Sequence, residues 1–245
     1  MWPLQLFGYC LVLPAKLIIS GVLLCIPLLF TAPATAFTGS GSCQGCHAEE
    51  FDLWKGSHHD LAMQLPSPDT VLGNFDNTTF TYNGITTRFF RDGEKYIVNT
   101  DGEDGKLQNF EVAYVFGVDP LQQYLLPLSR GRLQALSIAW DARAESVGGQ
   151  RWYHLYPDEP IDFKDPLHWT GTYQNWNTSC AECHSTDLKK NYQADTRSFN
   201  TQFAELNVGC EACHGPGEEH LALAEQGKLK DSEHGGFPTD LAQRG

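Results

Sequence analysis

Basic residues are scarce in this chain of 245 residues: 17 Lys and Arg face 30 Asp and Glu, for a formal net charge of −13 at neutral pH. Such an excess of acid repels phosphate backbones, so the composition argues against nucleic acid as a partner. It suits a basic protein as a partner, although solubility alone also explains an acidic surface.

Acidic residues are missing from residues 1–36, where Lys16 is the single basic residue. Residues 17–30 are almost wholly apolar, and Ala34-Thr35-Ala36 supplies the small residues that a signal peptidase needs. We therefore predict a signal peptide over residues 1–36 and an exported protein, located in the periplasm or at the cell surface. The alternative is an uncleaved segment that associates with the membrane, because the apolar run over residues 11–30 approaches bilayer length.

No cysteine of the exported chain is left over for a structural disulfide, because Cys10 and Cys25 leave with the signal peptide. The other six lie in three units: Cys43-Gln44-Gly45-Cys46-His47, Cys180-Ala181-Glu182-Cys183-His184 and Cys210-Glu211-Ala212-Cys213-His214. Two cysteines three apart face one way on a helical turn, so both sulfurs can form thioethers with one porphyrin. The histidine that follows can bind the iron as proximal ligand. The pattern predicts three haems c, each with its iron.

Zinc is the rival interpretation of these cysteines. Cys180, Cys183, Cys210 and Cys213 could in principle form a four-thiolate site. A zinc ribbon needs no histidine after each pair, however, and the first pair of cysteines has no partner pair. We therefore prefer haem. The chain also lacks a Cys-x-x-Cys-Lys unit, which excludes a lysine-ligated haem of the kind found in pentahaem nitrite reductases.

The middle of the chain is expected to be β-structure. Segments rich in β-branched and aromatic residues are separated by Asn83-Gly84 and Asp92-Gly93, which are typical of tight hairpin turns. They predict an antiparallel β-meander with strands over residues 78–82, 85–91 and 95–99, and further strands over 110–116 and 133–140.

Helices are expected to be short. We predict one over residues 47–55, ended by Gly56, and another that begins at Glu218. The spacing of Phe203, Leu206, Cys210 and Cys213 predicts that the third motif ends a helix. The fold class is then α+β, with short helices and long loops packed round the haems beside a small antiparallel β-meander. The predicted segments are a signal peptide (1–36), a first haem segment (37–75), a β-rich insert (76–145) and an aromatic-rich segment with the second and third motifs (146–245).

Aromatic side chains crowd residues 151–176, where prolines interrupt any regular period. Such a segment suits the wrapping of large flat apolar groups such as haem. The alternative is an ordinary protein core.

These motifs, together with the residues that follow them, resemble those of a known protein family. The first motif followed by Trp54-x-x-Ser57-x-His59-x-x-Ala62-Met63, and the third followed by Gly215-Pro216-Gly217 and His220, resemble exported multihaem c-type cytochromes. The resemblance is to the clan that includes the tetrahaem cytochrome of ammonia oxidisers and hydroxylamine oxidoreductase. Residues 120–125, 148–152 and 175–177 resemble, more narrowly, the haem domain of members that carry tetratricopeptide repeats. Those members continue into a further Cys-x-x-Cys-His motif and helical repeats, so we expect the N-terminal part of a longer protein.

Six histidines remain for the distal side of the irons: His58, His59, His154, His168, His220 and His234. The resemblance implies that His59, within the Trp-x-x-Ser-x-His pattern, and His220, within Cys-His-Gly-Pro-Gly-x-x-His, are distal ligands. His168 and His154 compete for the third position, and His168 is preferred because it lies only twelve residues before Cys180. Met63 could replace a histidine and raise the potential, but a packing role suits a methionine better.

The number of protein ligands available to each iron indicates the function. An iron with two protein ligands has no vacant position for a substrate, so we expect an electron-transfer protein that meets redox partner proteins. The alternative is an oxidoreductase in which one open haem acts on a small nitrogen or sulfur species, with Arg130, Arg132 or Arg151 binding the anion. A scaffolding module is a third possibility, favoured only by the relatives with tetratricopeptide repeats.

Overall fold

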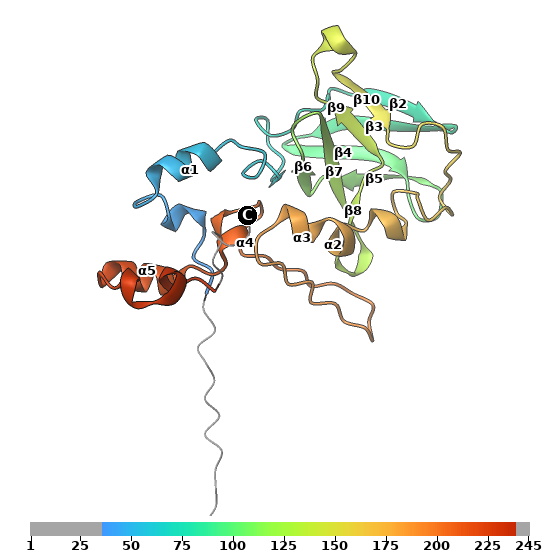
Figure 1. The fold of residues 1–245 in the computed structure, drawn as a ribbon. Helices are drawn as coiled ribbons and strands as arrows, with labels where there is room; N and C mark the ends of the chain where they lie inside the picture. Colours follow the sequence, from blue (N-terminus) through green and yellow to red (C-terminus); the bar gives the residue numbers. More distant parts are fainter. Residues whose placement is uncertain (1–35, 239–245) are drawn as a thin grey trace, which may run out of the picture. The chain divides into compact units, whose positions relative to one another are not determined.

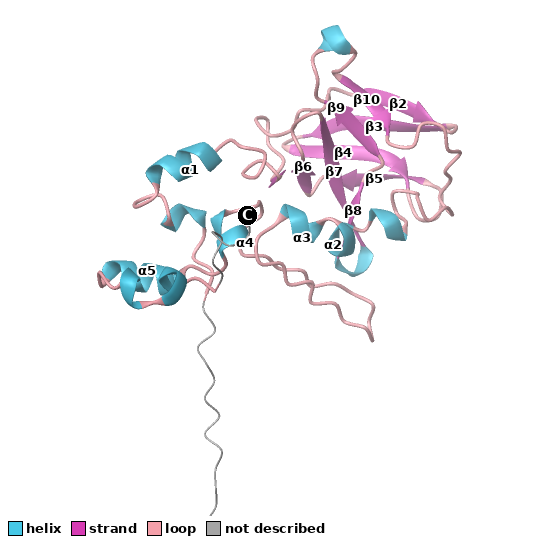
Figure 2. Ribbon diagram, in the orientation of Figure 1, coloured by secondary structure: helices cyan, strands magenta, loops and turns pink. Residues whose placement is uncertain are grey.

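The computed structural model of this chain describes residues 36–238. The predicted signal peptide lies outside this range, apart from Ala36. Within the range, no helix has the length and apolar character needed to cross a membrane. Helices and antiparallel sheets both occur (Figure 2), which confirms the α+β class.

One sheet is the expected meander. Its strands β2 (Thr78–Tyr82), β3 (Ile85–Asp92), β4 (Lys95–Asp101) and β5 (Leu107–Glu111) pair antiparallel in chain order (Figure 1). Asn83 and Gly84 form the first turn with φ values of 45° and 79°, the left-handed conformation that a two-residue hairpin needs.

A second sheet has six strands and was only partly predicted. Its order is β1-β6-β7-β9-β10, and β8 pairs with β7. The bounds are β1 (Met63–Gln64), β6 (Tyr114–Phe116), β7 (Leu121–Leu128), β8 (Arg132–Ala135), β9 (Ile138–Asp141) and β10 (Arg151–His154). The expected strand over 110–116 is divided between β5 and β6, and the one over 133–140 between β8 and β9. Strands β7 and β10 were missed, because Pro120, Pro127 and the irregular aromatic pattern hid them.

Aromatic residues from 151–176 enter the protein core. The Trp152 ring stacks on Phe89 with centroids 3.6 Å apart, and Trp169 belongs to the same buried cluster, which includes side chains of both sheets. Trp176 is fully buried in a second cluster with Met63 and Leu125. Trp152, Trp169 and Trp176 of this segment therefore belong to the protein core, whereas Tyr173 is exposed.

Within residues 36–238, five short α-helices lie at or beside the motifs: α1 (Ala48–Trp54), α2 (Trp176–Ser179), α3 (Ala181–His184), α4 (Cys210–His214) and α5 (Glu218–Glu225). The same range contains six 3-10 turns: Ser40–Ser42, Ser129–Gly131, Glu145–Val147, Thr172–Gln174, Leu229–Asp231 and Glu233–Gly236. Helices α1 and α5 confirm two predictions, and α2 packs against β8 (Figure 1).

The prediction of a helix leading into the third motif is wrong. Residues 203–209 are not helical, and the chain before them returns along residues 186–193 through the bridges Thr186↔Glu205, Lys189↔Gln202 and Gln193↔Ser198. We call residues 186–205 the arm. Extended pairing supplies the backbone hydrogen bonds that a helix would otherwise provide.

Candidate functional site

Each Cys-x-x-Cys-His motif forms a single helical turn. In the first, the amides of Cys46 and His47 both donate to the Cys43 carbonyl, at 3.2 and 2.9 Å. The second motif forms α3 with Cys180 as its N-cap, and the third forms α4. In every motif the first cysteine is partly buried and the second is exposed, and all six thiols are free. Each turn thus presents two thiols as a porphyrin with two vinyl groups requires.

The first and third motifs touch each other through their leading cysteines. Burial, followed by the charge of Cys210 and a hydrogen bond with Cys210, raises the pKa of the Cys43 thiol to about 11. The Ser40 hydroxyl accepts from the Cys210 amide at 2.9 Å and donates to the Glu205 carboxylate at 2.8 Å. Among residues 36–238, no three His, Cys, Asp or Glu side chains converge as a bare metal ion would need.

Glu211, inside the third motif, anchors the segments on either side of this contact. Its side chain is buried, and its carboxylate accepts from the amides of Thr38, Gly39 and Gly217 at 2.7 to 2.9 Å. It therefore ties the segment before the first motif to the Gly-Pro-Gly turn before α5. Sequence reasoning missed this role, because an acid at this position of a motif carries no local signal.

Two histidines have a ring nitrogen held by a backbone carbonyl. His184 Nδ1 lies 3.1 Å from the Ala62 oxygen, and His220 Nδ1 lies 2.9 Å from the Gly235 oxygen. A carbonyl can only accept, so Nδ1 carries the proton in both rings and Nε2 keeps a lone pair. This is the arrangement that orients a metal-ligating histidine.

The rings of His47 and His220 are neighbours, at a spacing that fits one iron. Their ring centroids are 6.2 Å apart, at an interplanar angle of 33°. Metal–imidazole bonds of about 2 Å, with about 1 Å more from each nitrogen to its ring centre, separate two opposed rings by about 6 Å. Phe237 supports the arrangement, since it stacks on His220 at 4.5 Å and lies 5.5 Å from His214.

The segment after α1 runs between the second and third motifs. The His59 carbonyl accepts from the Val208 amide at 3.2 Å, two residues before Cys210, and His59 is exposed, as is His58. Met63, in contrast, is fully buried beside Ala181 of the second motif. The structure therefore places His59 near two motifs and gives Met63 a packing role.

His154 lies on β10 instead, and His168 lies on a loop beside Asp101 of β4. His168 is buried with Nε2 3.2 Å from Asp101 Oδ2 and Nδ1 2.8 Å from the Thr170 hydroxyl, so both nitrogens are engaged. His154 stacks on Tyr82 at 3.6 Å, and its Nδ1 accepts from the Tyr156 amide. Both histidines line a small cavity whose described walls include no residue of a motif. The structure does not bring either of them to a haem motif.

The short helices fit an additional apolar group. Helix α1 buries none of its side chains, and Leu53 exposes 77% of its surface. Helix α5 likewise has no buried residue. Helices of seven or eight residues are marginal without packing partners, and uncovered apolar side chains indicate a surface that something covers. Haem attached at the neighbouring motifs fits this requirement.

Comparisons with known proteins agree with this chemistry. Residues 42–75 and 161–215, which contain all three motifs, match the family model described as cytochrome c554 and c-prime. A search of curated proteins gives no match. The solved crystal structure of outer cell wall cytochrome OcwA matches with a TM-score of 0.48 and 19% identity, over 84% of this chain and 35% of that one. The chain thus spans 35% of the length of that solved protein. The family match supports a c-type cytochrome with covalently bound haem.

Proposed function

We propose that this chain carries electrons through three covalently bound haems, held at Cys43 and Cys46, at Cys180 and Cys183, and at Cys210 and Cys213. When bound, haem supplies one-electron redox chemistry at its iron. His47, His184 and His214 would bind the irons of these haems. The observation that carries the proposal is the neighbouring pair His47 and His220, whose spacing suits an iron with two histidine ligands.

His220 acts in this proposal as the distal ligand for the first motif, although it follows the third motif in sequence. The hydrogen bond from its Nδ1 to Gly235 aims Nε2 away from the backbone, and Phe237 fixes the ring plane. His59 is the proposed second distal ligand, because its backbone lies beside the residues before Cys210.

Closeness of the motifs favours electron transfer. Cys43 and Cys210 are in contact, so groups attached to these two residues lie close together. The second motif connects to the same region, since His184 donates to Ala62, three residues after His59. The polypeptide thus gathers the three attachment sites around residues 59–63.

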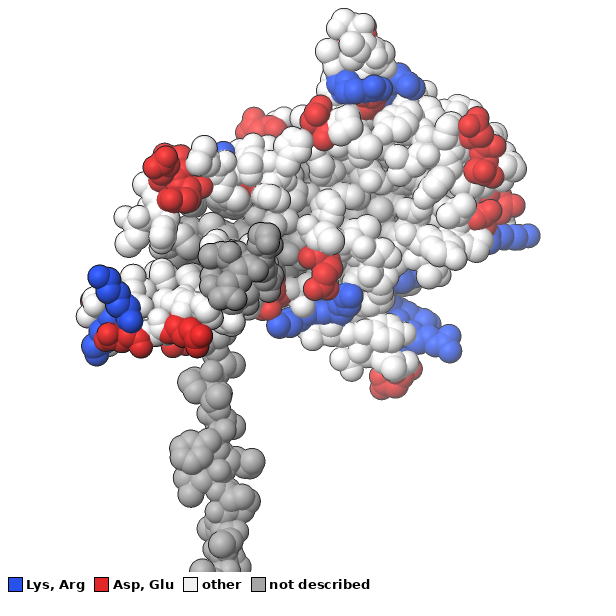
Figure 3. All heavy atoms as spheres, viewed as in Figure 1, with Lys and Arg blue, Asp and Glu red and all other residues white. Residues whose placement is uncertain are grey.

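We also propose export, to the periplasm or the cell surface, by the signal sequence in residues 1–36. Basic redox proteins are the proposed partners. Acidic side chains are spread over α1, α5 and the sheets on the face drawn in Figure 3, in keeping with the formal charge of −13. A complementary basic surface would be steered toward the protein.

A second candidate function is an oxidoreductase with one open haem, acting on a small nitrogen or sulfur species. It is favoured by the placement of His154 and His168, whose hydrogen bonds and stacking occupy them on β10 and beside β4. The second motif would then keep a position for substrate opposite His184.

Electron paramagnetic resonance of the haem-loaded protein tests the ligand assignment. We expect His220→Ala to convert one of three ferric haems to the high-spin state, because that iron loses a strong ligand. His58→Ala, which changes an exposed histidine, should leave the spectrum unchanged. An entirely low-spin His220→Ala variant would refute the pairing.

Two measurements on the unchanged protein separate the candidate functions. Intact mass should show three covalent haems, and a chain without covalent additions would refute both candidates. A high-spin population in the unchanged protein, with a spectral shift on adding nitrite or hydroxylamine, would favour the oxidoreductase.

A further inference from the structure

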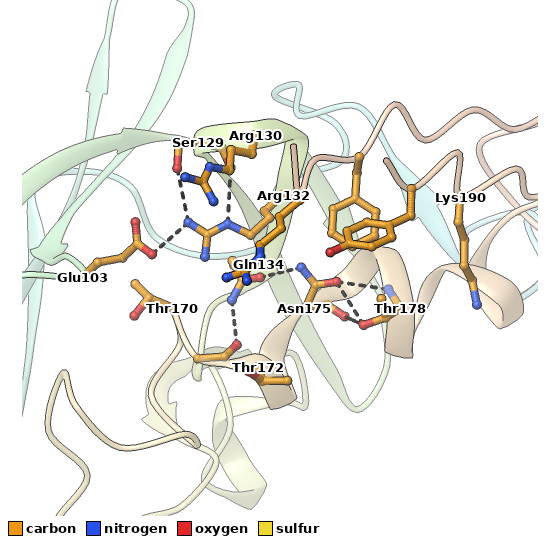
Figure 4. A pocket seen from close by; sticks show the side chains of 14 residues that line it. Glu103, Ser129, Arg130, Arg132, Gln134, Thr170, Thr172, Asn175, Thr178 and Lys190 are labelled. Carbon is orange, nitrogen blue, oxygen red and sulfur yellow. Dashed lines mark hydrogen bonds and ion pairs between the residues drawn. The ribbon is translucent and has the colours of Figure 1, made fainter. Parts of the chain in front are cut away.

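A groove of about 900 Å³ lies beside the second motif, and its walls come from three stretches of chain together with Glu103. The turn at 129–131 and β8 contribute one wall, the residues leading to Cys180 contribute the floor, and the arm contributes the opposite wall (Figure 4). None of the six motif cysteines or three motif histidines lines it. The groove is therefore distinct from the haem attachment sites.

Positive charge dominates this groove in an otherwise acidic protein. Arg130, Arg132, Lys190 and Arg197 line it, and Glu103 is its only acidic residue among those described. Glu103 is already paired, since it accepts from Arg132 at 2.8 Å. Within residues 36–238, no carboxylate lies within ion-pair distance of Arg130 or Arg197. A hollow lined by one sign of charge concentrates the field at its centre.

The two unpaired arginines are held by a fixed backbone. Arg130 and Arg197 both adopt left-handed conformations, with φ of 63° and 52°, which arginine adopts only at a cost. The Phe199 amide donates to the Arg130 carbonyl at 2.9 Å. A Cβ added at Gly131 would lie 2.1 Å from the Phe199 oxygen. The arm is thus docked closely on the turn, and strained residues held in this way are typical of binding sites.

An aromatic surface completes the groove. Tyr192 and Phe199 lie on the arm with ring centroids 4.9 Å apart, and Tyr192 is half exposed. Such rings accept a flat apolar body, while guanidinium groups bind carboxylate or phosphate oxygens in pairs.

We propose that this groove binds a small organic polyanion, with its flat body on Tyr192 and Phe199 and its anionic groups on Arg130 and Arg197. The volume favours a small molecule, because ligand pockets measure roughly 300–1,000 Å³. A protein partner would instead need a wider contact surface. The inference stands apart from the proposed electron transfer, because it requires no haem to change oxidation state.

Calorimetric titration of the haem-loaded protein at low salt tests this site. The probe is benzene tricarboxylate, compared with citrate, which carries three carboxylates without a ring, and with neutral benzene tricarboxamide. We expect the tricarboxylate to bind more tightly than citrate and the amide not to bind. Arg130→Gln and Arg197→Gln should each weaken tricarboxylate binding about tenfold or more, the effect of losing a charged hydrogen bond.

Arg88→Gln is the matched control, since Arg88 is exposed and lies on β3 outside the groove. It should leave affinity unchanged, and all three variants should keep the haem spectrum and melting temperature. Equal affinity of the groove variants and the control would overturn the site, as would binding of the neutral amide or of an acidic peptide in place of the tricarboxylate. Equal affinity for citrate would overturn the assigned aromatic surface.

Discussion

Glu211 shows how a single carboxylate can connect two cofactor sites. All of its close partners are donors: the amides of Thr38, Gly39 and Gly217, and the Thr38 hydroxyl at 3.2 Å. A carboxylate offers only acceptors, so every contact is favourable. A glutamine of the same shape would direct an NH₂ group at one of these donors.

We therefore expect Glu211→Gln to lower the free energy of unfolding by about 1–3 kcal/mol, the cost of leaving buried donors unsatisfied. Because Gly217 begins the turn into α5, the variant should also weaken the low-spin signal that depends on His220. Glu182→Gln in the second motif is the control, since Glu182 is exposed and only 3.7 Å from Lys190. Urea unfolding and paramagnetic resonance measure the two effects. Equal behaviour of the two variants would show that Glu211 positions nothing.

His154 makes stability depend on pH. Burial lowers the pKa of its imidazole below the usual value, so the unfolded chain binds a proton more readily than the folded one. Stability is then complete above the unfolded pKa of about 6.5 and falls as the pH drops toward the folded pKa. We expect urea unfolding to show a loss of stability between pH 7.5 and 5.5. His154→Asn, which keeps an acceptor for the Tyr156 amide, should show a smaller loss, and an identical loss would contradict this role.

At the scale of elements, Gln134 connects β8 to the segment that leads into the second motif. Its buried amide donates to the carbonyls of Trp169 and Gly171 at 3.0 and 2.8 Å, and its oxygen accepts from Asn175 at 2.9 Å. Two backbone carbonyls and the Asn175 side chain thus have Gln134 as their hydrogen-bond partner. Asn175 in turn caps α2, because its side chain accepts from the Thr178 amide.

We expect Gln134→Leu to lower the free energy of unfolding by about 2–4 kcal/mol, because it leaves several buried polar groups without partners. Gln108→Leu, an exposed change on β5, should stay within about 0.5 kcal/mol of the original protein. Chemical denaturation followed by circular dichroism compares the two. A small effect of Gln134→Leu would mean that water replaces its hydrogen bonds.

The elements that could be predicted are those specified by local sequence. Strands β2, β3 and β4 follow from β-branched runs, and Asn83-Gly84 forms the first turn as predicted. Asp92 instead ends β3 opposite Lys95, so the second turn is Gly93-Glu94. The prediction of a helix before Cys210 was wrong because Phe203 and Leu206 reach the second core cluster equally well from an extended chain. The spacing of apolar residues cannot distinguish a helix from an extended chain when distant residues supply the backbone hydrogen bonds.

The candidate site, like the fold, could be predicted only where its features are local in the sequence. The three motifs are local, so their turns were evident from sequence, whereas a distal ligand depends on the path of the whole chain. His220 lies beside His47 because Glu211 and Gly235 position it, and neither contact has a sequence pattern. His168 has a favourable place in the sequence, yet Asp101 of β4 engages it.

At the scale of the whole molecule, we expect charge to govern the encounter with the proposed basic partners. The formal charge of −13 attracts basic proteins over distances comparable to the Debye length, about 10 Å at 0.1 M salt. We expect the rate of electron exchange with a small basic cytochrome to fall at least tenfold as salt rises from low to high concentration, since electrostatic steering contributes factors of about 10–1,000. Stopped-flow absorbance of the haems measures it. A neutral small-molecule oxidant is the control, and its rate should hardly change. A basic partner whose rate is equally insensitive to salt would show that the acidic surface serves solubility rather than recognition.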